Sequence, residues 1–172
     1  MSPLRKFAGL LGFFVFVGNA QADFEEDYET KQWQELEVQL PAAPRADGLR
    51  SFYVSAASDN QFLIDQATLS VGSDGVVRYV LVVLTPGGGR NVTFEGMRCA
   101  TRERRIYASG RRDGMWSKSR NNEWSRIQDV YANRHHAALF LEYFCPGGVI
   151  VRDAAEAVDA LRRGGHPDNK PW

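Results

Sequence analysis

The sequence has no long hydrophobic run, few prolines and no excess of either charge. No stretch reaches the roughly 18 consecutive apolar residues of a membrane-spanning helix, so we predict no membrane span. The 7 prolines, and 16 glycines without a three-residue period, exclude a collagen-like protein, and a hydrophobic content of 44% excludes a disordered one. Lys and Arg together number 21, as do Asp and Glu, so bulk charge does not favour nucleic acid as a partner.

Catalytic sequence motifs are also missing. The chain contains no G-x-S-x-G, H-E-x-x-H, C-x-x-C or G-x-x-x-x-G-K-[ST] pattern. His135 and His136 are adjacent, and neighbouring helix residues point about 100° apart, so the pair is poorly placed to hold one metal ion. We therefore predict no metal, no cofactor and no catalytic residue. A hydrolase-type envelope enzyme that uses His135 or His136 is the alternative, although the sequence names no carboxylate partner for either ring.

Residues 1–22 have the organisation of a secretory signal. A positive start at residues 5–6 precedes an 11-residue apolar run at residues 7–17, and residues 20–22 (A-Q-A) have the small-x-small form of a signal-peptidase site. No cysteine lies near this site, which disfavours a lipid anchor. We expect a secreted protein that is cleaved after Ala22.

The rest of the chain contains an acidic segment followed by a basic one. Residues 23–40 hold seven acidic side chains against one lysine, and residues 98–134 hold ten basic side chains against four acidic ones. Either the two segments neutralise each other, or the basic segment binds an anionic envelope component through guanidinium groups, which suit phosphate and carboxylate. We expect an acidic N-terminal arm and linker over residues 23–45, a single α+β domain over residues 46–165 and a polar tail over residues 166–172.

Alternating apolar residues predict an antiparallel meander of about five strands. The strongest strand covers residues 76–85, where both faces are apolar and Arg78 is the only charge. We expect this strand at the centre of the sheet, with both sides covered. The five predicted strands cover residues 50–56, 61–71, 76–85, 91–101 and 104–109.

Later in the chain the apolar period becomes that of helices. Asn133 is placed to cap a helix that runs to about Phe144. Asp153 and Glu156 resemble a capping box before a second helix, which Gly164 can end. The expected fold class is therefore α+β, an antiparallel β-meander with two C-terminal helices packed on it.

Five side chains are candidates for binding a ligand. Arg105 and Tyr107 share one face of a strand, where a guanidinium beside a phenol hydroxyl suits an oxyanion or a sugar phosphate. Trp116 lies in a polar stretch where an aromatic ring can stack on a sugar, and Arg134 and His135 lie at the start of the first helix. The alternative for each is structural: Tyr107 half-buried with Arg105 above it, Trp116 packed over an open end of the sheet, and His135 in a first-turn role.

Cys99 and Cys145 are the only cysteines, so a secreted chain has one possible intramolecular disulfide. With Cys99 at the end of a strand and Cys145 at the end of a helix, the bridge would join the sheet to the helical layer. Buried free thiols and a redox couple are the alternatives, although redox pairs are usually close in sequence. We predict the structural disulfide.

Several blocks of the sequence, taken together, resemble a known family. They are D-G-V-V-R-Y, N-V-T-F-E-G-M-R-C and R-x-Y-A between residues 74 and 108, then Trp116, Trp124, R-H-H at residues 134–136 and Y-F-C at residues 143–145. This combination resembles the cryptic neisserial protein 1-like family of Gram-negative bacteria, over about residues 33–165. The resemblance implies a periplasmic or lipoprotein-like protein, here the soluble form, and implies no reaction and no site residues. We expect a soluble periplasmic protein that is a non-catalytic binding or structural module of the cell envelope.

Overall fold

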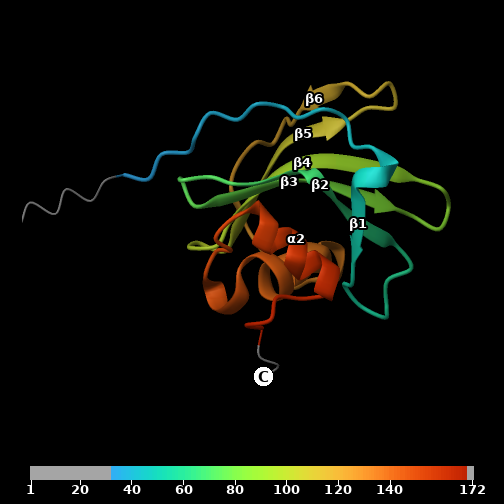
Figure 1. Cartoon of the computed structure of the whole chain (residues 1–172). Coiled ribbons are helices and arrows are strands. Elements are labelled where there is room, and N and C mark those ends of the chain that lie inside the picture. The colour runs from blue at the N-terminus through green and yellow to red at the C-terminus, as the bar shows by residue number, and fades with distance from the viewer. Residues whose placement is uncertain (1–31, 170–172) are drawn as a thin grey trace, which may run out of the picture. The chain divides into compact units, whose positions relative to one another are not determined.

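An antiparallel sheet forms the middle layer of the fold (Figure 1). The computed structural model describes residues 32–169, so the predicted signal sequence lies outside the described residues. Within them, each of the first five strands pairs with the next, and β7 pairs with β5, which confirms the predicted meander. The strands are β1 (Leu49–Phe52), β2 (Gln61–Val71), β3 (Val76–Leu84), β4 (Arg90–Arg98), β5 (Glu103–Gly110), β6 (Trp116–Lys118) and β7 (Ser125–Arg126).

Strand β3 is buried on both faces, as predicted. Every residue from 76 to 82 is buried, and Arg78, the only charged one, pairs with Asp74 at 2.5 Å between Nη2 and Oδ2. Alternate side chains enter different cores: Tyr79 belongs to the core shared with the helices, and Val80 to a smaller core on the other face. The sheet therefore needs a cover on each side.

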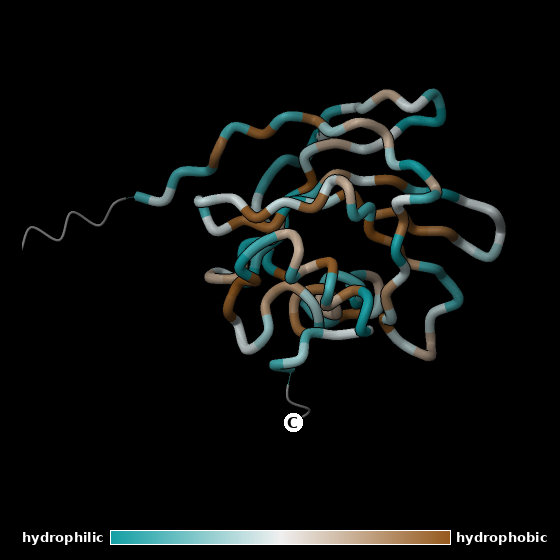
Figure 2. Tube along the Cα trace, viewed as in Figure 1, coloured by the Kyte–Doolittle hydropathy of each residue, from teal (hydrophilic) through white to brown (hydrophobic). Residues whose placement is uncertain are grey.

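The C-terminal helices cover one face of the sheet (Figure 1), which confirms the α+β class. In Figure 2, hydrophobic residues are concentrated in the strands and helices, while the loops are mostly hydrophilic. None of the described helices is long and apolar enough to cross a membrane. The helical segments are η1 (Ala46–Gly48), η2 (Tyr131–Asn133), α1 (Arg134–Ala138), the π-helical η3 (Leu139–Phe144), η4 (Pro146–Gly148) and α2 (Ala154–Arg163).

The two predicted helix caps have different outcomes. At α2, Asp153 Oδ1 accepts a hydrogen bond from the Glu156 backbone N–H at 2.9 Å, and Gly164, with a φ of 76°, ends the helix as predicted. Asn133 makes no side-chain capping bond, so the prediction that it caps the first helix is wrong. The chain enters α1 from the turn η2, where the Asn133 N–H donates to the Val130 carbonyl, rather than from the extended conformation that capping requires.

A disulfide joins Cys99 to Cys145, as predicted. Cys99 follows β4, Cys145 follows η3, and their Cα atoms lie 5.6 Å apart. Both residues are buried in the core between the sheet and the helices. The bridge therefore ties an inner strand of the sheet to the helical layer.

Residues 33–45, here called the strap, lie along the other face of the sheet and appear in blue in Figure 1. Val38 of the strap packs on the smaller core, which includes Val82, Phe94 and Tyr107. The strap has no helix or strand of its own within residues 33–45. One face of the sheet is thus covered by helices, and the other by an extended segment.

Candidate ligand-binding site

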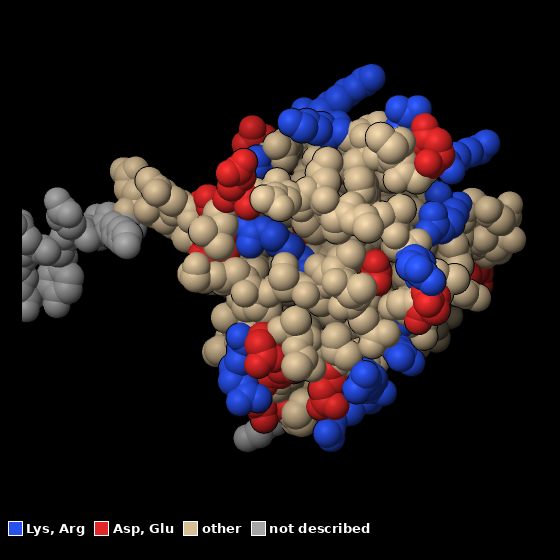
Figure 3. Space-filling view, turned by 45° about the horizontal axis from the view of Figure 1, so that its top comes forward, with Lys and Arg blue, Asp and Glu red and all other residues tan. Residues whose placement is uncertain are grey.

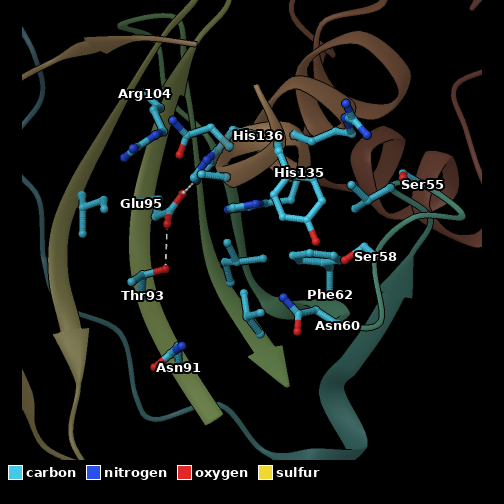
Figure 4. Close-up of a pocket in the computed structure, with 18 residues that line it drawn as sticks. Ser55, Ser58, Asn60, Phe62, Asn91, Thr93, Glu95, Arg104, His135 and His136 are labelled. Atoms are coloured by element: carbon cyan, nitrogen blue, oxygen red, sulfur yellow. Dashed lines mark hydrogen bonds and ion pairs between the residues drawn. The ribbon is translucent and has the colours of Figure 1, made fainter. Parts of the chain in front are cut away.

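A cleft of about 400 Å³ opens on the helical face of the sheet (Figure 4). Strands β2 to β5 contribute its floor, and the loop after β1 and the start of α1 contribute its walls. Most of the side chains that line it are polar. They are Ser55, Ser58, Asn60, Asn91, Thr93, Glu95, Arg104, Tyr131, Asn133, Arg134, His135 and His136.

Glu95 is a buried carboxylate at the floor of the cleft, with only 1% of its surface exposed. Thr93 Oγ1 donates to Glu95 Oε1 at 2.6 Å, and the Tyr79 hydroxyl donates to Oε2 at 3.2 Å. His136 Nε2 lies 2.8 Å from the same Oε2 (Figure 4). Burial by itself would raise the pKa of Glu95, but the His136 ring and the Thr93 hydroxyl outweigh it and lower this pKa to about 2. Glu95 is therefore a carboxylate whose two oxygens are already satisfied.

The other ring nitrogen of His136 has no partner. Nδ1 is buried and makes no hydrogen bond to any described residue. Buried polar atoms are nearly always hydrogen-bonded, so an unsatisfied one beside a cleft is a notable exception. Because Glu95 holds Nε2, Nδ1 is the ring atom left to interact with another group.

His135 forms an aromatic wall of the cleft rather than a charged one. Its ring stacks on Phe62, with centroids 5.1 Å apart and planes inclined by 15°. Burial, together with the neighbouring His136 ring, lowers the pKa of His135 to about 4. The ring is therefore neutral near pH 7. The described residues contain no group of three or more His, Cys, Asp or Glu side chains placed to hold a metal ion.

The structure separates the five predicted ligand-binding residues onto opposite faces of the sheet. Arg134 and His135 line the cleft. Arg105, Tyr107 and Trp116 lie on the face covered by the strap, so the two groups cannot contact one small ligand together.

On the strap face, the predicted residues already hold a carboxylate of the chain itself. The Tyr107 hydroxyl donates to Glu35 Oε1 at 2.5 Å, and the Arg105 guanidinium donates to Glu35 Oε2. Trp116 Nε1 donates to the Pro41 carbonyl at 2.7 Å. The pairing of a guanidinium with a phenol does bind an oxyanion here, and that oxyanion belongs to the strap.

Sequence reasoning did not single out Glu95 or Phe62, although the position of Glu95 in its strand is a signal that could have identified it. In β4, Val92 and Phe94 face the smaller core, while Thr93 and Glu95 face the helices. A lone carboxylate on a face that packs against helices must be paired, because burying an unpaired charge is costly. The partner, His136, is 41 residues away, and no local pattern names it.

Comparison with known proteins agrees with the resemblance in the sequence. A profile of the CNP1-like family matches residues 28–162, a region that contains both the strap and the cleft. The chain is 28% identical, over 140 residues, to cryptic neisserial protein 1 of Neisseria gonorrhoeae (strain ATCC 700825 / FA 1090), an alignment that covers 72% of this chain and 69% of that protein. No solved structure matches this one.

Proposed function

The chain belongs to the CNP1-like family, and we propose that it is a soluble periplasmic, non-catalytic binding module of the cell envelope whose cleft binds an acidic sugar. The observation that carries this proposal is the chemistry of the cleft lining. Amide, hydroxyl and guanidinium groups surround an aromatic wall, in a hollow large enough for about two sugar rings.

The neutral part of the lining suits a sugar ring. The stacked rings of Phe62 and His135 offer an apolar wall for the C–H face of a pyranose. Asn60, Asn91 and Asn133 carry both donors and acceptors, which match the hydroxyl groups of a sugar. Asn60 directly precedes β2, Asn91 is in β4 and Asn133 is in the turn η2 before α1. A bound ring would therefore contact both the sheet and the helical layer.

The charged part of the lining favours an anionic substituent. Arg104 and Arg134 both line the cleft, and guanidinium groups bind carboxylate or phosphate through paired hydrogen bonds. Glu95 is the only carboxylate in the lining, and His136 and Thr93 already engage its oxygens. The cleft therefore presents two guanidinium groups to a ligand, of which Arg134 also pairs with Asp129 at 3.4 Å, and one carboxylate that is already paired.

Calorimetric titration with three disaccharides tests this function. The probes are a disaccharide containing muramic acid, a glucosamine disaccharide bisphosphate and neutral chitobiose. We expect at least one acidic disaccharide to bind more tightly than chitobiose, and Arg104→Gln to weaken that binding about tenfold through loss of a charged hydrogen bond. The two acidic probes separate a carboxylate from a phosphate as the recognised group.

The control for this titration is Arg126→Gln, which removes an exposed guanidinium on β7, outside the cleft. Equal affinity for all three sugars, or no binding to any, would contradict the proposal. So would an equal loss of affinity in the Arg104 and Arg126 variants.

A second candidate is a hydrolase, favoured by the pairing of His136 with Glu95 at 2.8 Å beside the cleft. A histidine oriented by a carboxylate is the base of many hydrolases, and Nδ1 has no partner that would block it. Incubating the protein with the same disaccharides and measuring released reducing ends tests this alternative. Activity that disappears in His136→Asn supports it, and intact disaccharides after prolonged incubation contradict it.

A further inference from the structure

Side chains, rather than a ladder of backbone hydrogen bonds, hold the strap on the sheet. Among the described residues, no backbone-to-backbone hydrogen bond joins residues 33–44 to a strand. Trp33 Nε1 donates to the Asp74 carbonyl at 2.7 Å, and the Leu36 N–H donates to Asp74 Oδ2 at 2.9 Å. Farther along, Trp116 Nε1 donates to the Pro41 carbonyl. The strap can therefore leave the sheet without breaking any backbone-to-backbone hydrogen bond among the described residues, although its departure uncovers the smaller core.

Glu35 is the most firmly held side chain of the strap. Its carboxylate accepts hydrogen bonds from the Tyr107 hydroxyl at 2.5 Å, from Trp124 Nε1 at 3.2 Å and from Arg105. Arg78 Nη2 lies 3.8 Å away, and only 14% of the Glu35 side chain is exposed. Donors from two parts of the fold, β5 and the loop that contains Trp124, converge on one carboxylate, which makes this a built receptor for an acidic group.

The strap also has the period of a polyproline II helix. Its partly buried residues recur at every third position, and the residues between them are exposed: Glu35, Val38, Pro41 and Pro44. Polyproline II has three residues per turn and no internal hydrogen bonds. Proteins that bind such segments use grooves lined with aromatic rings, as Tyr107 and Trp116 line this one.

We propose that the strap face of the sheet is a receptor for an extended acidic peptide of a partner protein, and that the strap occupies this receptor as an internal competitor. The strap shows the chemistry of the peptide: a glutamate, an aliphatic residue three positions later, and prolines six and nine positions later. This site is separate from the cleft, which lies on the opposite face of the sheet.

An internal competitor lowers the apparent affinity for the external peptide, because the peptide binds only the fraction of molecules whose receptor is open. A substitution at Glu35 that weakens the attachment of the strap to the sheet should therefore strengthen the binding of a peptide that carries its own glutamate. Glu37, which is exposed and makes no side-chain contact among the described hydrogen bonds and ion pairs, offers a matched control on the same segment.

Fluorescence anisotropy with a labelled synthetic peptide of residues 33–45 (WQELEVQLPAAPR) tests the proposal on the full chain. We expect Glu35→Ala to bind this peptide about tenfold more tightly than the unmodified chain does, and Glu37→Ala to bind it like the unmodified chain. A peptide whose first glutamate is alanine should bind the Glu35→Ala chain about tenfold more weakly. Circular dichroism confirms that each variant is folded. Trp33→Ala, which loosens the same end of the strap without removing the glutamate, should reproduce the gain.

The proposal is overturned if neither the Glu35→Ala nor the Trp33→Ala chain binds the peptide while both are folded. It is also overturned if the peptides with and without the glutamate bind equally. Dimers of the unmodified chain that Glu35→Ala abolishes, measured by sedimentation, would make a second copy the occupant and would overturn the assignment to a partner protein.

Discussion

At the scale of single residues, Glu95 and His136 place an ionisable pair in the interior of the fold. Glu95 is 1% exposed and His136 is 4% exposed, and they lie between the sheet and the first helix. A buried carboxylate is tolerated only when its hydrogen bonds are satisfied, and here Tyr79 and Thr93 complete the set. The stability of the fold therefore depends on the charge of one side chain.

That dependence predicts a response to acid. Because the pKa of Glu95 is lowered from 4.5 to about 2 by folding, its contribution to the free energy of unfolding is complete above about pH 4.5 and is lost as the pH falls toward about 2. Glu95→Gln mimics the protonated side chain, so it should unfold with about 3 kcal/mol less free energy than the unmodified chain near neutral pH, a difference that shrinks toward zero near pH 2. Urea unfolding at several pH values measures this.

The control for the acid response is Glu123→Gln, since Glu123 is exposed. Its curve of unfolding free energy against pH should run parallel to that of the unmodified chain. A constant difference between the Glu95→Gln and unmodified curves over the whole acid range would show that the pair does not account for the pH dependence.

At the scale of elements, sequence patterns predict strands β1 to β5 and miss β6 and β7. Strand β3 was predictable because apolar residues on both of its faces exclude an exposed position. Strands β6 and β7 have three and two residues, mostly polar and exposed, and so have no alternation to detect. Their pairing with β5 depends on where the rest of the chain brings them.

The same limit applies to the candidate site. Arg105 and Tyr107 were predictable as a pair that suits an oxyanion, because alternate residues of a strand share a face. Their carboxylate partner, Glu35, lies 70 and 72 residues earlier in the chain, and nothing local distinguishes it from Glu37. The cleft was likewise not predictable, because it depends on how far α1 stands from the sheet.

The disulfide predicts a loss of stability at the scale of elements. It closes a loop between residues 46 positions apart and joins β4 to the end of η3. Chain entropy puts its contribution at up to about 4 kcal/mol, so reduction should lower the melting temperature by about 10 °C. Calorimetry with and without a reductant measures the shift.

The reductant itself should have no effect on the double variant Cys99→Ala/Cys145→Ala, which serves as its control. If thiol titration shows complete reduction and the melting temperature is unchanged, the bridge does not hold the two layers together.

At the scale of the whole molecule, many basic side chains lie beside acidic ones. Figure 3 shows basic and acidic side chains interspersed around the face in view. Within the basic segment, Arg98, Arg111 and Arg134 lie within 3.9 Å of acidic groups. The whole chain has a formal net charge of zero, so long-range attraction to an anionic polymer is weak.

This arrangement predicts a modest, local salt effect on sugar binding. Affinity for the acidic disaccharide should fall by several-fold between about 0.01 and 0.15 M salt, because screening acts on the two guanidinium groups of the cleft. Affinity for chitobiose, titrated under the same conditions, should not change. A fall in affinity of several orders of magnitude would instead indicate a broad basic surface. An affinity that does not change with salt would show that the two arginines do not bind the acidic group.

The strap also has a consequence for the order of folding. The strands of the sheet pair with neighbours along the chain, whereas strap contacts such as those from Tyr107 and Trp124 to Glu35 join residues 72 and 89 positions apart. Long loops cost more entropy to close, and non-local contacts form late. We therefore expect the meander to form first and the strap to dock last. A chain that emerges from its N-terminus exposes the strap before any of its receptor exists, so the strap appears before the sheet and docks after it has formed.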